Sequence, residues 1–594
     1  MTAALDSATA ASDPVPDALG GLVRCQLRPG VGVTPLRDGL HLRGWRSSVT
    51  LEGSRALPAL WQLLEEALRT GDHTALTVRA PAGSPLRTAL NALIGHLHAH
   101  DLLVDRAEPA SRWLHALSRH PAAAAAAIAA AHPQVLCADP TSPFAQAAAR
   151  ALHRAGATPS VAAPLATSGP AGLLVLLGPT GGPGRSVAVA ARMSGDGGFV
   201  TAPGTPEQVT ADATALAARL GRAAGDGSSA PAALTALVAG AAAQRLVCAV
   251  GGLPDPASEG DDRLGLPGRP SVLVADADPL RAEYHAWLGP RLPGSEQNQD
   301  HPAPLAPPDT LAQALRRVAA LGDERLGVLP PPLPGVLPQL PVALVGCPIP
   351  GGTLLAAGAR TDLARLDAVC RAAELRLSEE EFDVAVGATP EHARGRALRR
   401  AASRAGGERL PARSWADHPQ ARHWWRTLTE RLHRPAELSV ERLGSGAHCA
   451  TVHVAGHRLS RPLSRAVEAT PGDAAAFAAL GAVARTVSAD MTFRQLSVPS
   501  GASAALAVAG LVLTGWEDEG WTTGWLAGIA TREPALLAAL RRETGMHREA
   551  GLHLEADLRA TPLREAADPE NRALAAALLA CGFTVLSTPG GAAR

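Results

Sequence analysis

Short runs of strand-favouring residues, separated by glycine and proline turns, begin the first organised region, residues 21–110. Turn sequences such as Pro29-Gly30 and Asp38-Gly39 lie between these runs. Short runs bounded by turns predict three β-strands in a meander. The predicted strands are Val23–Leu27, Leu40–Arg43 and Ser47–Leu51.

Apolar residues then recur at helical spacing and predict an amphipathic helix over Leu57–Arg69, which Gly71 ends. Ser84-Pro85 supplies an N-cap and a proline at the first position of a second helix. A short strand, Leu102–Val104, closes the region. The order of three strands, helix, short segment, helix and wing predicts a winged helix-turn-helix module.

Residues 111–290 alternate between apolar strands and alanine-rich helices. This alternation favours a mainly parallel sheet covered by helices, an α/β domain. The predicted helices are Ala122–Ala131, Pro143–Ala155 and Ala232–Val250. The predicted strands are Gln134–Ala138, Leu173–Leu177, Ser186–Ala190, Phe199–Thr201 and Ser271–Ala275.

Composition divides the rest of the chain. Residues 1–20 are rich in Ala, Ser and Asp and predict a disordered leader, whereas residues 291–341 are rich in Pro and Gly and predict a linker with one helix, Asp309–Leu321. Residues 342–594 begin with a strand and continue with helices, which indicates an α+β domain. The fold class is therefore multidomain α/β, as expected for 594 residues.

Charge and cysteine content limit the possible chemistry. The 55 basic residues balance 55 acidic ones, which argues against a nucleic-acid binder held by net charge. Every basic residue is arginine, so a Walker A lysine, a Schiff-base lysine and a lysine base are all excluded. The seven cysteines form no C-x-x-C pair, which disfavours a four-cysteine zinc site and fits a reducing compartment.

The N-terminus lacks the basic and apolar regions of a signal peptide. The most apolar stretches, such as Leu173–Leu177, are judged too short to span a bilayer. We therefore expect a soluble, cytoplasmic protein without membrane contact.

A phosphate-binding loop is not evident where a dinucleotide site would need one. The strand Gln134–Ala138 continues into Asp139 and two prolines, and it lacks the glycines that let a backbone approach phosphates. The segment Gly178–Gly184 contains two prolines and precedes a strand, which indicates a turn. No GxSxG, HExxH or EF-hand pattern occurs, so we predict no catalytic residue, no metal and no cofactor.

Two clusters of polar residues can each be interpreted either as a ligand-binding site or as a structural feature. Asp276 and Asp278 follow a predicted strand and could bind a metal or a ribose, although Asp278-Pro279 is equally a turn signal. His448, His453 and His457 surround a predicted strand and could hold zinc, or they could face solvent. The structural interpretation is favoured in both cases.

A winged helix-turn-helix module can bind DNA, but its predicted recognition helix is weakly basic. Besides Arg87 and Asn91, it carries His96, His98 and His100. An exposed edge strand beside a helix is better suited to capture an extended peptide by strand addition. We therefore expect a peptide partner and no nucleic acid.

The N-terminal module resembles the RiPP recognition element, the leader-peptide clamp of peptide natural-product biosynthesis, in the segments GVTPLRDGLHLRGWRSSVTLEG, ALPALWQLLEEAL and LNALIGHLHAHDLL. The next region resembles a ThiF-like domain, related to ubiquitin-activating enzymes, in GGFVTAPG, ALVAGAAAQRLVCAVGGLPDP and SVLVADADPLRAEYHAWL. Together they resemble the ocin-ThiF-like, or F-type, partner proteins of azoline-forming YcaO cyclodehydratases, as in thiopeptide clusters. The missing glycine loop and cysteine pairs would fit a degenerate ThiF-like domain.

The segment GTLLAAGARTDLARLDAVCRAAELRL is similar to a part of YcaO enzymes in which helix carboxylates bind Mg-ATP. Here Glu374 lies between Arg371 and Arg376, and the carboxylate array is not evident. Residues 342–594 therefore resemble a degenerate YcaO-like domain.

The resemblance implies a noncatalytic subunit that binds the leader of a ribosomal precursor peptide. It would deliver the core of that peptide to a separate YcaO cyclodehydratase, which forms thiazolines and oxazolines; an azoline dehydrogenase is a further partner. The alternatives are a fused ATP-dependent cyclodehydratase, a flavin-dependent azoline dehydrogenase and a winged-helix DNA-binding regulator.

The resemblance also implies where the leader binds. It would add a strand beside the third strand and pack on the last helix of the module. Arg46 and Arg87 would pair with leader carboxylates. The residues nominated by position are Arg46, Ser47, Ser48, Val49, Thr50, Leu51, Arg87, Leu90, Asn91 and Ile94.

Overall fold

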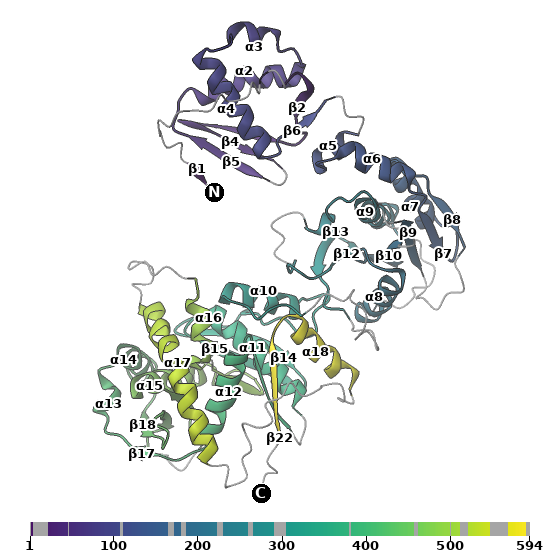
Figure 1. Ribbon diagram of the computed structural model, residues 1–594. Coiled ribbons are helices and arrows are strands. Elements are labelled where there is room, and N and C mark those ends of the chain that lie inside the picture. Colours follow the sequence, from purple (N-terminus) through teal and green to yellow (C-terminus); the bar gives the residue numbers. More distant parts are fainter. Residues whose placement is uncertain are drawn as a thin grey trace. The chain divides into compact units, whose positions relative to one another are not determined.

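The computed structural model divides into two compact units (Figure 1). Unit 1 comprises Met1–Ala213, Ala224–Gly260 and Ala275–Arg281; unit 2 comprises Thr214–Ala223, Asp261–Val274 and Ala282–Arg594. The structure describes residues 2–3, 19, 22–44, 47–106, 111–163, 172–179, 186–221, 230–258, 265–289, 304–378, 382–456, 461–498, 500–510, 521–546 and 568–589.

The N-terminal module of unit 1 contains an antiparallel meander of β3 (Gly32–Leu36), β4 (Gly39–Arg43) and β5 (Ser48–Glu52). A short strand, β1 (Thr2–Ala3), runs parallel to β5, which gives the order β1-β5-β4-β3. Gly39 is required at its position, because a Cβ there would lie 2.2 Å from the Leu51 carbonyl oxygen.

The meander predicted from sequence is wrong in one strand. The predicted first strand, Val23–Leu27, becomes β2 (Cys25–Leu27) and pairs with β6 (Leu103–Asp105) instead. The actual third member of the meander is β3, which was not predicted because Gly32 and Pro35 are poor strand residues.

Three helices complete the module, and Figure 1 shows them on one face of the meander. They are α2 (Leu57–Thr70), α3 (Thr74–Arg79) and α4 (Pro85–Ala99). The predicted signals at their ends are confirmed: Gly71 ends α2 with φ 80°, and Ser84 Oγ accepts from the Arg87 N–H at 3.2 Å. The module core is almost entirely aliphatic, with Trp61 its buried aromatic residue among those described.

A buried arginine joins the module to the next helix, α5 (Arg112–Leu117). Arg28 donates from Nη1 to the carbonyls of His115 at 2.7 Å and Ser118 at 2.6 Å, and from Nη2 to Asp101 at 2.6 Å. Because all these acceptors surround one guanidinium, the end of α5 is tied to the residue after β2 and to the end of α4.

The central sheet has the strand order β13-β12-β11-β10-β9-β7-β8. The pair β7–β8 is parallel, but β7–β9, β9–β10 and β10–β11 are antiparallel, so the predicted mainly parallel sheet is wrong. Hairpins connect strands that had been expected to need helical crossovers. The strands are β7 (Gln134–Cys137), β8 (Ser160–Ala162), β9 (Leu173–Pro179), β10 (Ser186–Ser194), β11 (Gly197–Val200), β12 (Ser271–Ala277) and β13 (Leu280–Ala286).

Four helices accompany this sheet: α6 (Pro121–Ala130), α7 (Pro143–Arg154), α8 (Pro206–Arg219) and α9 (Ala232–Val250). The bounds of α9 are those predicted. With 19 residues, α9 is long and apolar enough to cross a membrane, contrary to the sequence expectation that no stretch is. It packs on α7, β9 and β10 with ten buried residues, as the core helix of a soluble fold does, so its length is weak evidence for a membrane span.

The described residues of unit 2 form three small sheets: β14-β15-β21, β16-β22 and β17-β18-β19-β20. Its central helix, α15, is buried on all sides from residue 472 to 484, which its many alanines allow because they permit close packing. The helices are α11 (Thr361–Leu377), α12 (Pro390–Ala402), α13 (Arg413–Ala416), α14 (Pro419–Arg426), α15 (Pro471–Val487), α16 (Ala504–Val508), α17 (Trp521–Met546) and α18 (Pro569–Ala580). The strands are β14 (Ala343–Ile349), β15 (Gly352–Gly358), β16 (Phe382–Gly387), β17 (Glu408–Arg409), β18 (Ala436–Arg442), β19 (His448–Val454), β20 (Ser464–Glu468), β21 (Gln495–Ser497) and β22 (Thr584–Pro589).

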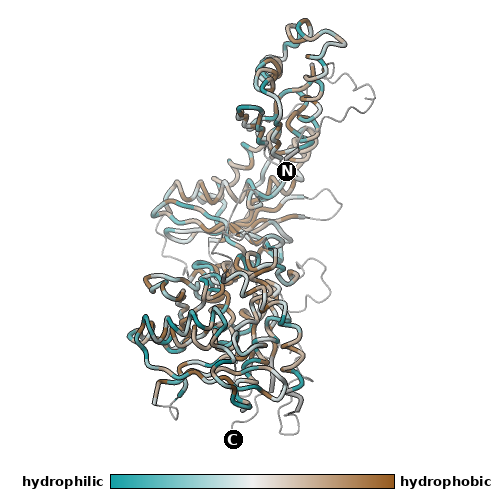
Figure 2. Tube along the Cα trace, turned by 90° about the vertical axis from the view of Figure 1, so that its left-hand side faces the viewer, coloured by the Kyte–Doolittle hydropathy of each residue, from teal (hydrophilic) through white to brown (hydrophobic). Residues whose placement is uncertain are grey.

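The described part of the predicted linker packs into unit 2. Its helix, α10 (Leu311–Leu321), buries Leu311, Ala314, Val318 and Leu321 in the same hydrophobic core as α11 and α15. Apolar residues placed between prolines allow a proline-rich segment to pack in this way. The predicted helix of the linker is therefore present, but residues 304–341 pack as part of unit 2. Figure 2 shows hydrophobic and hydrophilic positions mixed along the helices and strands, as in elements that bury one face.

Candidate functional site

The outer edge of β5 is the feature on which the sequence prediction depends. On one side β5 pairs with β4 through five residues, from Gly39↔Glu52 to Arg43↔Ser48. On the other side it pairs only with β1, at Thr2↔Thr50 and Ala3↔Leu51. Within the described residues, the rest of this edge has no neighbouring strand. The edge therefore accepts an added strand, and a two-residue segment of this chain lies there.

Side chains along β5 alternate between the core and the surface. Val49 and Leu51 are buried at 3% exposure, whereas Ser48 and Glu52 are exposed. Thr50 is half-buried, and its Oγ1 lies 2.8 Å from Nδ1 of His41. A strand added at this edge would therefore be held mainly by backbone hydrogen bonds.

The structure brings the nominated residues of β5 and α4 into one module, but it places the apolar ones in its core. Leu90 and Ile94 are fully buried at 0% exposure, and they do not line surface pockets. Asn91 is buried too, and its Oδ1 accepts from the Leu19 N–H at 3.0 Å. A leader peptide in contact with these three side chains would have to displace part of the core.

The nominated polar residues have local partners. Ser47 Oγ donates to the His100 carbonyl at 2.7 Å, and Arg87 Nη1 donates to the Ala80 carbonyl at 3.1 Å. Arg46 lies outside the described residues. Whether these groups also contact a peptide stays a prediction.

A second constellation lies in unit 2, and the sequence analysis named only Glu374 and Arg371 of it, without their partners. Glu374 on α11 is a fully buried carboxylate held by arginines. Its Oε1 accepts from Arg396 Nε and from the Val386 N–H, each at 3.1 Å. Its Oε2 accepts from Arg371 at 2.9 Å and from Arg400 at 2.7 Å. Burial raises the pKa of this carboxyl, but the arginines, Arg396 first, lower it to about 2.

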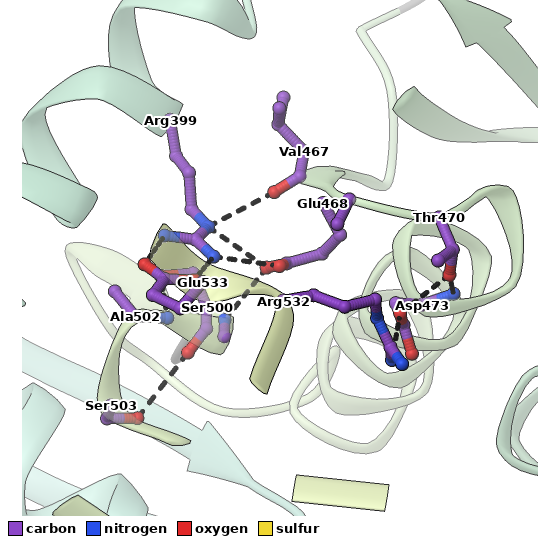
Figure 3. Close-up of polar contacts among 12 residues, drawn as sticks. Arg399, Val467, Glu468, Thr470, Asp473, Ser500, Ala502, Ser503, Arg532 and Glu533 are labelled. Carbon is purple, nitrogen blue, oxygen red and sulfur yellow. Dashed lines mark hydrogen bonds and ion pairs between the residues drawn. The ribbon is translucent and has the colours of Figure 1, made fainter. Parts of the chain in front are cut away.

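Arg399 on α12 is the centre of a neighbouring network (Figure 3). Its guanidinium binds Glu468 through Nη2 at 2.8 Å and Nε at 3.1 Å, and binds Glu533 through Nη1 at 2.7 Å. Glu468 also accepts from the Gly501 N–H at 2.8 Å. Burial raises the pKa of Glu468, and Glu533 adds to this, while Arg399 opposes it.

Asp473 at the start of α15 belongs to a third group, also drawn in Figure 3. It accepts from Trp525 Nε1 at 2.9 Å, from Arg532 Nη2 at 2.7 Å and from the Thr470 hydroxyl at 2.6 Å. Burial raises the pKa of Asp473, but hydrogen bonds from His418, Thr470 and Trp525 and the charge of Arg532 lower it to about 2. This group holds α17 against α15.

A cavity of about 210 Å³ lies among α11, α12 and β20. Asp367, Glu374 and the hydroxyl-bearing Ser403, Ser497 and Ser500 line it, together with the apolar Val467, Phe477 and Val498. Its five arginines are Arg371, Arg396, Arg399, Arg400 and Arg465. Cationic groups therefore outnumber carboxylates on its wall.

The sequence carries a partial signal of this cluster. Asp367, Arg371 and Glu374 follow one another at helical spacing on α11, so they share a face of that helix. Their partners cannot be found in the same way, because Arg399 is 69 residues from Glu468 and 134 from Glu533. Helical spacing thus predicts a charged face but not that it is buried.

The carboxylates of the cluster do not fit the Mg-ATP site that the YcaO resemblance would imply. Mg²⁺ needs carboxylate oxygens with free lone pairs. Here both oxygens of Glu374 accept from arginine, and Glu468, Glu533 and Asp473 are each paired with arginine as well. A guanidinium on every one of these carboxylates opposes the approach of a cation.

The other clusters considered from the sequence are structural. Asp139 accepts from the Thr141 N–H at 2.8 Å in a turn before α7. The turn interpretation of Asp278 is confirmed, since it lies between β12 and β13. His448 is buried, so the expectation that it faces solvent is wrong, and its Nδ1 lies 3.0 Å from the Ala469 carbonyl oxygen; His457 lies outside the described residues. No group of three metal-binding side chains occurs within the described ranges.

No protein-family model matches the chain, and no curated protein is similar to it. Solved structures similar to it include a heterocyclase in complex with substrate and cofactor, 12% identical over 89% of this chain and 91% of that chain, with a TM-score of 0.43. The heterocyclase TruD is 13% identical over 86% and 91%, at 0.37. E. coli MccB with AMPCPP and MccA is 10% identical over 46% and 98%, at 0.28. TM-scores below 0.5 do not establish a shared fold.

Proposed function

We propose that this chain binds the leader of a ribosomally made precursor peptide along the outer edge of β5 and delivers the core of the peptide to a partner YcaO cyclodehydratase. The observation that carries the proposal is the pairing of β1 with β5, because it makes that edge a site of strand addition. The resemblance of residues 20–290 to F-type partner proteins supports the identity of the ligand.

The geometry of β5 favours recognition of backbone over side chains. Its inward residues, Val49 and Leu51, are occupied in the core, and its outward residues are small or polar. Backbone pairing would supply most of the affinity, and Arg87, on α4 of the same module, would select acidic leaders.

The buried ion pairs of unit 2 support a noncatalytic role. Glu374, Glu468 and Glu533 each hold an arginine, so none of them is available to bind Mg-ATP. On this proposal, ATP-dependent azoline formation takes place on the partner enzyme in the cytoplasm, and an azoline dehydrogenase acts afterwards. The seven free cysteines fit that compartment.

Fluorescence polarisation tests the proposal with the full chain and a fluorescein-labelled leader, taken from a precursor peptide gene sought next to this one. We expect a Kd on the order of micromolar or tighter, as in other strand-addition complexes. Hydrogen exchange should show new protection confined to Ser48–Glu52 and its neighbours. A scrambled leader is the peptide control, although backbone pairing will leave it some affinity.

Two results would count against the proposal. Binding without protection of β5 would place the peptide elsewhere on the chain. ATP-dependent conversion of the precursor by this chain alone would favour the fused cyclodehydratase instead.

A further inference from the structure

The cavity of unit 2 contains more positive charge than its own carboxylates neutralise. Arg371, Arg396 and Arg400 share Glu374, and Arg396 also pairs with Asp367. Arg399 is held by Glu468 and Glu533. Five arginines of the cavity lining are thus set against four carboxylates, of which only Asp367 and Glu374 line the cavity, and this excess of positive charge favours an anion.

Arg465 on β20 is the arginine left over in this count. It is exposed, and it donates from Nε to Thr451 Oγ1 at 3.1 Å and from Nη1 to the Ser403 carbonyl at 2.5 Å. No described carboxylate forms an ion pair with it. Both of these acceptors are uncharged, so its charge is available to an oxyanion.

Asp367, on the wall of the same cavity, supplies an acceptor. Its side chain is only 3% exposed, and its Oδ1 pairs with Arg396. Its Oδ2 is buried and accepts no hydrogen bond from the part of the chain that the structure describes. A buried carboxylate oxygen without a donor is costly, so a ligand that brings a hydroxyl would be favoured here.

We propose that this cavity binds inorganic phosphate without a divalent cation, with Arg465 pairing with the anion and Asp367 Oδ2 accepting a hydrogen bond from its P–OH group. Inorganic phosphate keeps at least one hydroxyl at neutral pH, whereas sulfate, of the same shape, has none. The 210 Å³ cavity is large enough for this ion and its water. The site would therefore differ from a Mg-nucleotide site in two ways: it would need no metal, and it would bind phosphate more tightly than sulfate.

The proposal does not depend on leader binding, because the cavity and β5 belong to different units of the chain. Phosphate could be free or could be released by a partner that consumes ATP. The same probe, inorganic phosphate, tests the site in either case, and adding ADP in a second arm shows whether a nucleotide competes.

Isothermal titration calorimetry of the full chain with sodium phosphate at pH 7, in EDTA, is the test. We expect binding by the wild type that is unchanged by added Mg²⁺, and at least about tenfold weaker binding of sulfate, since sulfate leaves Asp367 Oδ2 unpaired. Arg465→Gln should weaken phosphate binding by about tenfold or more, and Arg465→Lys by less, because a lysine keeps the charge but loses the planar fork. Arg404→Gln, at an exposed arginine outside the cavity lining, is the matched control and should change nothing.

The proposal is overturned if the wild type binds no phosphate, if binding requires Mg²⁺, or if sulfate binds as well as phosphate. Equal affinity of Arg465→Gln and wild type would also overturn it. Circular dichroism checks the fold of each variant. If Arg465→Gln does not fold, the phosphate–sulfate comparison on the wild type still decides.

Discussion

The N-terminal module and unit 2 use charge in opposite ways. In the module, Arg28–Asp101 is partly buried, with side chains 5% and 35% exposed, but Arg69–Glu66, at 70% and 63%, and Arg55–Asp38, at 78% and 52%, lie on the surface. In unit 2, the Arg396–Glu374 side chains are 9% and 0% exposed, and Arg399–Glu468 is 5% and 1%. The module is held by aliphatic packing, whereas unit 2 has charged networks inside it.

This difference indicates which groups in each region are available to bind a ligand. A module with an aliphatic core can leave a strand edge open, because its stability does not depend on that edge. In unit 2 each buried carboxylate is committed to an arginine, since an unpaired buried charge would be very costly. Surface charges can be changed with little effect on folding, and buried ones cannot.

Glu374→Ala should produce the largest effect. It leaves Arg371, Arg396 and Arg400 without their common acceptor, so we expect a loss of about 3–5 kcal/mol in the unfolding free energy of unit 2. Glu66→Ala, in the exposed pair of the module, should cost about 0.5 kcal/mol or less. Urea unfolding of the full chain followed by tryptophan fluorescence measures both. Similar losses for the two variants would remove the distinction between the regions.

Acid should weaken unit 2 through the same carboxylate. The folded pKa of Glu374 is about 2, below its ordinary value of 4.5, so its contribution is complete above pH 4.5 and is lost as the pH falls from 4.5 towards 2. The shift corresponds to about 3 kcal/mol at most. We expect the urea midpoints of wild type and Glu374→Gln to converge over this range. A constant gap between them would show that the pKa of Glu374 is not lowered.

Local features of the fold could be predicted from the sequence, and long-range ones could not. The α9 bounds and the Ser84 cap follow from periodicity and from residue type at a helix start, which depend on neighbouring residues alone. The antiparallel central sheet could not be predicted, because it depends on which strands pair. The helix α10 was predicted, but its packing in the core of unit 2 was not.

The candidate sites show the same limit. Ser47–Leu51 was predicted as a strand from its strand-favouring residues and the turns beside it, but the pairing of β5 with Thr2–Ala3 links residues 48 positions apart. Leu90 and Ile94 were nominated as leader contacts, but they lie on the apolar face of α4, and such a face is usually core. The Arg399 network joins three elements distant in sequence, so no local pattern could reveal it.

Removing residues 1–18 should strengthen leader binding, and we expect this effect to be smaller in free energy than the effect of Glu374→Ala on unfolding. If β1 covers the β5 edge about four-fifths of the time, its loss improves the apparent affinity about fivefold. The truncated chain should begin at Leu19, whose N–H binds Asn91. The double variant Thr2→Pro, Ala3→Pro is the matched control, because it removes the backbone donors of β1 and should act like the truncation. Unchanged affinity in fluorescence polarisation would mean that β1 does not compete with the leader.

Arg87→Ala should produce the smallest effect. Arg87 is half-buried on α4 and donates to the Ala80 carbonyl, so it can offer only part of its guanidinium to a leader carboxylate. We expect about a twofold loss of leader affinity at low salt and none at high salt, since exposed pairs are weak and screened. Arg69→Ala, on the exposed face of α2, is the control and should leave affinity unchanged at both salt concentrations. A loss that persists at high salt would instead mean that Arg87 acts by holding the start of α4 against Ala80. Leader recognition by the module would then depend on an internal polar contact, in the way that the fold of unit 2 depends on its buried ion pairs.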